Sequence, residues 1–216
     1  MEYPYDDILR TRVAQHLVHF PNETLDGSGL RHAAVAVTIV ADLDGEAALL
    51  MTRRAASLRA HAGQWALPGG RIDQGESPED AALRELREEV AMDLPPQAVL
   101  GRLDDYVTRS GFLITPIVVW AGPTASPVPN PAEVSSIHLV PLTVLDHPDV
   151  PRLLSIPESD RPVLQIPLHG VAHPERTELT VVHAPTAVFL YQLREAGIHG
   201  RTTRVAHFEQ PVFAWK

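Results

Sequence analysis

One amphipathic helix constrains the fold of this chain more than any other segment. Ser77 is a natural N-cap, Pro78 fits the first helical position, and Asp80 follows three residues after the cap. The helix is expected to run to about Ala91 and to stop before Pro95. Residues three and four apart share a helix face, so the sequence assigns each side of this helix a distinct chemistry.

The two sides of the helix are apolar and acidic. The apolar side, which can pack against a sheet, consists of Leu83, Leu86 and Val90. The acidic side consists of Glu85, Glu88 and Glu89. Three neighbouring carboxylates repel one another, and a hard cation such as Mg²⁺ or Mn²⁺ would neutralise them. The alternative is an acidic face that is exposed to solvent and paired with Arg84 and Arg87.

Strand-like apolar segments surround this helix in the sequence. They are residues 33–40, 47–52, 99–107, 112–121, 136–140, 163–168 and 179–182, and further helices are expected over 3–19 and 185–196, the second closed by Gly197. A turn at 42–45 joins the first two segments as a hairpin. Strands and helices in mixed order predict an α/β sandwich with a mixed sheet. We expect one domain over 1–216, with a core at about 32–146 and a C-terminal extension over 147–216.

Composition excludes several classes of function. The net charge of −9 is unfavourable for binding DNA or RNA through phosphate contacts. The chain has no cysteine, which removes disulfides, thiolate metal sites and a cysteine nucleophile. The acidic first residues lack the pattern of a signal peptide, and no apolar run is long enough to span a membrane. We therefore expect a cytoplasmic protein without a membrane or nucleic-acid partner; a homodimer stays an open alternative.

The segment GRIDQGESPEDAALRELREEVAM, which starts at Gly70, resembles the Nudix box. The matching positions are Gly70, Glu76, Arg84, Glu85, Leu86, Glu88, Glu89 and Met92. Ala91 stands where the family has glycine, and the chain can accommodate alanine there if the helix continues one residue longer.

The resemblance implies a Nudix-type α-β-α sandwich and the hydrolysis of a diphosphate linkage in a nucleotide-like substrate. It also implies that Glu85, Glu88 and Glu89 bind Mg²⁺ or Mn²⁺ together with the carbonyl of Gly69. A salt bridge between Arg84 and Glu76 would orient the helix. The general base stays open between Glu85 and Glu133, an acid on a later loop.

The stretch before the box, LLMTRRAASLRAHAGQWALPGGRID, resembles the additional motif of the coenzyme A diphosphatase branch. Met51 and Leu67 depart from that motif. The resemblance implies cleavage of coenzyme A to 3′,5′-ADP and 4′-phosphopantetheine. Cationic side chains that suit phosphate contacts are Arg53, Arg59, His61 and Arg71. The alternatives are a related enzyme acting on ADP-ribose or another nucleotide, and a Nudix-fold domain that senses a nucleotide without cutting it.

Overall fold

A computed structural model describes residues 2–57, 63–122, 126–171 and 179–215. Within them, the central feature is an eight-stranded sheet. Five of its strands are paired in the order β3-β2-β1-β7-β5, and the other three each pair with one of these: β4 with β1, β6 with β7 and β8 with β2. The pair β1–β7 is parallel and the others are antiparallel, so the sheet is mixed as predicted. The strands are β1 (Arg31–Ala41), β2 (Ala47–Arg54), β3 (Trp65–Ala66), β4 (Gly69–Arg71), β5 (Val99–Arg102), β6 (Tyr106–Val107), β7 (Phe112–Trp120) and β8 (Val134–Pro141).

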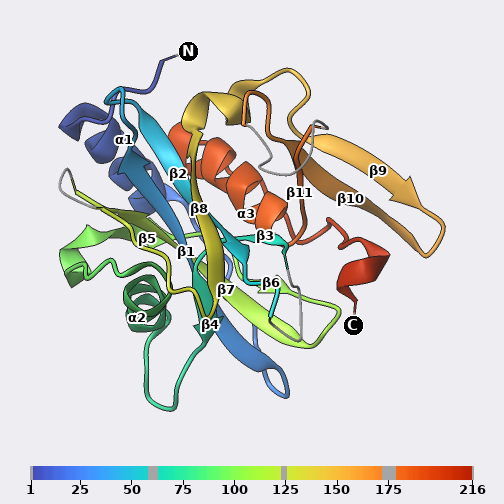
Figure 1. The fold of residues 1–216 in the computed structure, drawn as a ribbon. Helices are drawn as coiled ribbons and strands as arrows, with labels where there is room; N and C mark the ends of the chain where they lie inside the picture. Colours follow the sequence, from blue (N-terminus) through green and yellow to red (C-terminus); the bar gives the residue numbers. More distant parts are fainter. Residues whose placement is uncertain (1, 58–62, 123–125, 172–178, 216) are drawn as a thin grey trace.

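Helices cover the two faces of this sheet (Figure 1). α2 (Pro78–Val90) lies on one face, where Leu86 and Val90 pack with Ala36 and Ile117 of the sheet. α1 (Asp7–His19) and α3 (Thr186–Gln192) share the second and larger core on the opposite face. The molecule is therefore an α/β protein with a mixed sheet between helices, in agreement with the fold class predicted from the sequence.

The C-terminal extension builds a second, three-stranded antiparallel sheet in the order β11-β10-β9. Its strands are β9 (Arg152–Ile156), β10 (Ser159–Pro167) and β11 (Val181–His183), and it lies beside α3 (Figure 1). The aliphatic side chains of β10 and β11 enter the same core as α3, where Leu164, Ile166 and Val182 are fully or almost fully buried. The extension thus packs on the sheet face opposite α2.

Several expected boundaries were wrong. The helix expected over 3–19 begins at Asp7, because the Asp6 side chain caps it by accepting from the amide of Leu9 at 2.7 Å. The strand expected over 99–107 is divided into β5 and β6, and β9 lies before residue 163, where no strand was expected. Gly197 does not close the last helix, since α3 continues as a π-helical segment (Leu193–Ile198). Short 3-10 turns complete the described elements: η1 (Pro96–Ala98), η2 (Leu142–Asp146) and η4 (Val212–Ala214).

Candidate active site

The ends of α2 follow from local chemistry. The hydroxyl of Ser77 accepts from the amide of Asp80 at 3.1 Å, which satisfies an N–H group of the first turn. At the other end Ala91 has φ 55° and ψ 29°, in the left-handed region. The amide of Met92 then donates to the carbonyl of Leu86 at 3.1 Å, as in a Schellman cap. The chain therefore accommodates Ala91 without an additional helical residue, because Ala91 adopts the left-handed conformation that is usual for glycine.

The three glutamates of α2 do not share one environment. Glu85 and Glu89 are buried, with 9% and 4% of their surface exposed. The side chain of Glu88 is 49% exposed. A wholly solvent-exposed acidic face is therefore wrong for two of the three. Among the residues that the structure describes, the carboxylate oxygens of the three glutamates do not gather within 4.8 Å of one another.

Arg84 lies between the acidic side chains and ties them to the preceding loop. It makes a two-pronged contact with Glu76, with Nε donating to Oε1 at 2.9 Å and Nη2 to Oε2 at 3.1 Å. Its Nη1 donates to Glu85 at 2.7 Å and to Glu88 at 3.3 Å. The contact with Arg84 lowers the pKa of Glu76. The ion pair that the Nudix resemblance implied is thus present, and it fixes the loop against the first half of α2.

Glu89 is the most strongly buried acid of the helix. Burial raises its pKa to about 8, and its nearest cation, Arg54, is 3.9 Å away. The backbone of Gly69 donates a hydrogen bond to this carboxylate. Glu85 is also desolvated, and burial raises its pKa above the ordinary value. Two buried and incompletely compensated carboxylates are costly in an apolar interior, and a bound cation would offset that cost.

Gly70 makes room for Glu85. A Cβ atom added at Gly70 would lie 2.1 Å from Oε1 of Glu85, so any larger residue would displace the carboxylate. Glu133 lies close enough to raise the pKa values of both Glu85 and Glu89 by charge repulsion. Its backbone is anchored to the end of β2, where the amide of Ala55 donates to its carbonyl at 2.8 Å. The later acid chosen from the sequence therefore faces the helix carboxylates.

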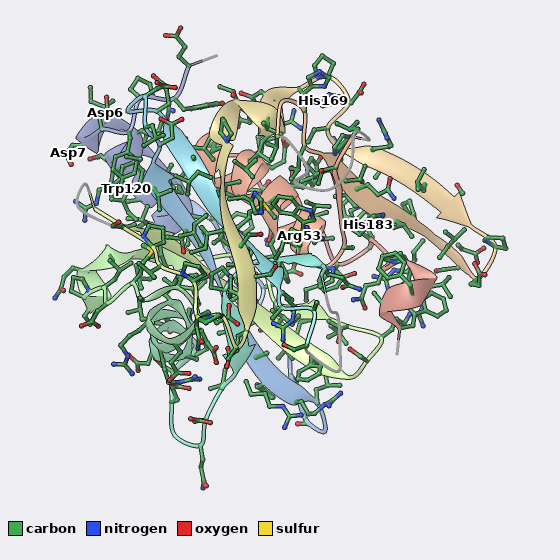
Figure 2. The ribbon with its side chains drawn as sticks, viewed as in Figure 1. Asp6, Asp7, Arg53, Trp120, His169 and His183 are labelled. Carbon is green, nitrogen blue, oxygen red and sulfur yellow. The ribbon has the colours of Figure 1, made fainter. Side chains whose placement is uncertain are left out.

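A cavity of about 580 Å³ opens beside this acidic cluster, between the sheet and the C-terminal extension. Gly69 and Arg54, which both contact Glu89, line it. Figure 2 shows Arg53 and His183, two further lining residues, which come from the core and the extension. The volume lies within the range of about 300–1,000 Å³ that is usual for small-molecule pockets.

The cationic residues chosen from the sequence have different positions. Arg53 lines the cavity and its guanidinium donates to the carbonyl of Gly63 at 3.2 Å. Arg71 is exposed on β4, with its guanidinium 5.8 Å from the ring centre of Phe112. Arg59 and His61 lie outside the described residues.

The sequence did not indicate that the C-terminal extension contributes to the cavity. The lining residues that were not predicted include Trp65 and Phe112 of the first sheet, and Thr180, His183, Gln210 and Phe213 of the extension. They are spread over about 150 positions and have no common motif. Only the packing of the second sheet against the first brings them together.

Two further observations bear on the predicted metal and membrane properties. A set of three potential metal ligands, His147, Asp149 and His169, gathers within 4.8 Å among the described residues, away from α2.

In the parts of the chain that the structure describes, the helices are too short or too polar to cross a bilayer.

Comparison with known proteins identifies the family. The model of the NUDIX domain matches residues 30–164, and the chain therefore belongs to the Nudix family. It is 46% identical over 114 residues to an uncharacterized Nudix hydrolase, NudL, of Photorhabdus laumondii, covering 52% of this chain and 60% of the relative. The NudL protein of Yersinia enterocolitica is 44% identical over 112 residues, covering 51% and 56%. The match thus spans less than two thirds of the length of these relatives.

Among solved structures, a MutT NUDIX hydrolase from Burkholderia pseudomallei aligns with a TM-score of 0.45 and 20% identity. The alignment covers 76% of this chain and 97% of that protein. The α/β fold with its mixed sheet, described above, agrees with this membership of the Nudix family.

Proposed function

We propose that this chain is a diphosphatase that uses Mg²⁺ or Mn²⁺ and cleaves coenzyme A to 3′,5′-ADP and 4′-phosphopantetheine. The observation that carries the proposal is the pair of buried carboxylates, Glu85 and Glu89, beside a cavity lined by Arg53 and Arg54. Carboxylates that can bind a dication thus lie near guanidinium groups that can contact phosphate oxygens, as the hydrolysis of a diphosphate linkage requires.

The donor set suits a hard cation. Glu85, Glu88, Glu89 and the carbonyl of Gly69 are oxygen ligands, which Mg²⁺ and Mn²⁺ prefer. The raised pKa of Glu89 fits a carboxylate whose charged form a bound cation would stabilise, and the absence of a side chain at Gly70 leaves room for Glu85. When bound, the ion would offset the charge that develops on the diphosphate oxygens.

The side chains of the chain itself have three roles in this proposal. Arg84 holds Glu85 and Glu88 in place and links them to Glu76. Arg53 and Arg54 contact the substrate phosphates from the cavity side. A carboxylate accepts the proton of the attacking water, and the two candidates are Glu85 and Glu133.

The sequence motif before the box supports coenzyme A over the other substrates, and the cavity gives room for a long substituent on the diphosphate. ADP-ribose and other nucleotides are the second candidate. A panel of coenzyme A, ADP-ribose, NADH, Ap₄A and dGTP, incubated with Mg²⁺ and analysed by mass, tests the proposal. We expect coenzyme A to be cleaved fastest, between its two phosphates. Rapid cleavage of ADP-ribose with intact coenzyme A would overturn the substrate, and no cleavage of any compound would overturn the activity.

A further inference from the structure

The cavity beside the acidic cluster changes in character along its length. Its ionised side chains among the described residues are Arg53 and Arg54, and the end of the cavity at Arg54 adjoins Glu89, which lies 3.9 Å from that guanidinium. The remaining described wall has no Arg, Lys or carboxylate, and four of its side chains are aromatic: Trp65 of β3, Phe112 of β7, Phe189 of α3 and Phe213 of η4. Burial lowers the pKa of His183, which disfavours a charged imidazole in this wall. A ligand that fits both ends carries a phosphate at one end and an uncharged chain at the other.

One wall of the neutral end is the free edge of a strand. Among the described strands β11 pairs with β10 alone, so it is the edge strand of its sheet. The amide of Leu168 donates to the carbonyl of Thr180 at 2.8 Å, which directs the polar groups of Thr180 towards β10. Because backbone groups alternate along a strand, the N–H and C=O groups of Val181 and His183 point to the opposite edge. Both residues line the cavity.

A buried hydroxyl lies on the same wall. Thr180 is 6% exposed and lines the cavity, and its Oγ1 has no hydrogen-bond partner among the residues that the structure describes. Buried hydroxyls in folded proteins are almost always hydrogen-bonded, so an unpartnered one calls for a donor or acceptor from outside the chain. An edge strand and a free hydroxyl together form a surface for hydrogen bonds to amide groups, as in strand addition.

We propose that this cavity binds an extended, amide-bearing arm of the substrate along the free edge of β11. The arm of 4′-phosphopantetheine has this chemistry: one terminal phosphate followed by an uncharged chain with two secondary amides. The adenosine half of coenzyme A carries a further phosphate and lacks such a chain, so it lies on the other side of the cleaved linkage. This inference rests on the proposed function, and it assigns the C-terminal extension the role of selecting the substrate.

Binding of the two product halves to the full chain tests the assignment without requiring catalysis. Calorimetric titration with 4′-phosphopantetheine and with adenosine 3′,5′-bisphosphate is compared for the wild type, Thr180→Val and Phe213→Ala. Valine keeps the shape of threonine and removes the hydroxyl. Phe213 is 55% exposed, so its truncation leaves the core intact. Val212→Ala is the matched control, because Val212 is equally near the C-terminus and does not line the cavity.

We expect Thr180→Val to weaken phosphopantetheine binding by about 2- to 10-fold, the effect of one hydrogen bond. Phe213→Ala should also weaken it, whereas Val212→Ala should not, and binding of the adenosine product should be unchanged in all three. Weaker binding of the adenosine product alone, or no change in either ligand, would overturn the arm site.

Hydrolysis of coenzyme A, measured on the same proteins, separates the two proposals. Cleavage of coenzyme A with unchanged phosphopantetheine binding in the variants overturns the arm site and leaves the proposed reaction. Specific binding of phosphopantetheine without cleavage of coenzyme A leaves the arm site and overturns the proposed reaction.

Discussion

Two adjacent glycines should respond to alanine substitution in opposite ways. At Gly70 a Cβ atom would lie 2.1 Å from Oε1 and 2.6 Å from Cδ of Glu85, and the atoms nearest to it all belong to that carboxylate. At Gly69 a Cβ atom would lie 2.6 Å from the backbone oxygen of Ala34 and 2.9 Å from Cα of Val35. A side chain can rotate away, whereas a paired strand cannot, and Gly69 pairs with Val35 in the β1–β4 ladder.

The magnitudes follow from these contacts. Relief of the clash at Gly70 requires Glu85 to move by more than an ångström, and a misplacement of about 1 Å in a catalytic group can cost about 100-fold in rate. Gly70→Ala should therefore lower kcat by about two orders of magnitude with little effect on stability. Gly69→Ala should destabilise the fold by about 1–3 kcal/mol, the usual cost of overpacking. For a chain of this size that lowers Tm by about 2–4 °C per kcal/mol.

Thermal denaturation and steady-state hydrolysis of the two variants are the assays. If Gly70→Ala retained wild-type kcat, Glu85 would not need its present position. If Gly70→Ala instead lowered Tm as much as Gly69→Ala, the inference that Gly70 affects the position of Glu85 and not the stability of the fold would be wrong.

Three further predictions concern the ends and charges of the fold. Ala91→Gly should raise Tm by a few degrees in a melting experiment, because it removes an alanine whose left-handed conformation costs about 1–2 kcal/mol. The greater freedom of glycine in the unfolded chain offsets part of this gain in stability. An unchanged or lower Tm would contradict the prediction. The hydrogen bond from Arg109 lowers the pKa of Glu209 from 4.5 to about 2. The contribution of this ion pair to the stability of the fold is therefore complete above pH 4.5 and is lost as the pH falls towards 2. The Tm difference between wild type and Glu209→Gln should vanish over that range, and a constant difference would rule out the ion pair as its cause. Arg84→Ala should lower stability by about 3 kcal/mol by leaving Glu76 without its partner, and equal Tm values would show that the contact has no structural role.

The elements with strong local signals were predictable. α2 carries an N-cap, a helical proline and an amphipathic pattern, and its start was correct to the residue. The hairpin of β1 and β2 was also correct, because a turn separates two apolar segments. The Nudix box in and before α2 indicated the same family as the comparison with known proteins, because this motif depends only on spacing within 23 consecutive positions.

The rest of the site depends on contacts that are distant in sequence. The burial of Glu89 and the exposure of Glu88 follow from how α2 is rotated on the sheet, which its own periodicity does not fix. α2 ended at Val90 with Ala91 as its C-cap, close to the expected end, but the left-handed conformation of Ala91 did not follow from the sequence. β11 and its free edge were not recognisable as a cavity wall, because the pairing of β11 and its position in the cavity depend on segments that are distant in sequence.

The central claim is that the carboxylates of α2 hydrolyse a diphosphate with the help of a dication. Its most direct test is the hydrolysis of coenzyme A by wild type and Glu89→Gln, each with Mg²⁺ and with excess EDTA, followed by mass analysis of the products. We expect the wild type to produce 3′,5′-ADP and 4′-phosphopantetheine with Mg²⁺ and not with EDTA. Glu89→Gln should lose this activity although it folds at least as stably as the wild type. Full turnover by Glu89→Gln, or by the wild type in EDTA, would contradict it.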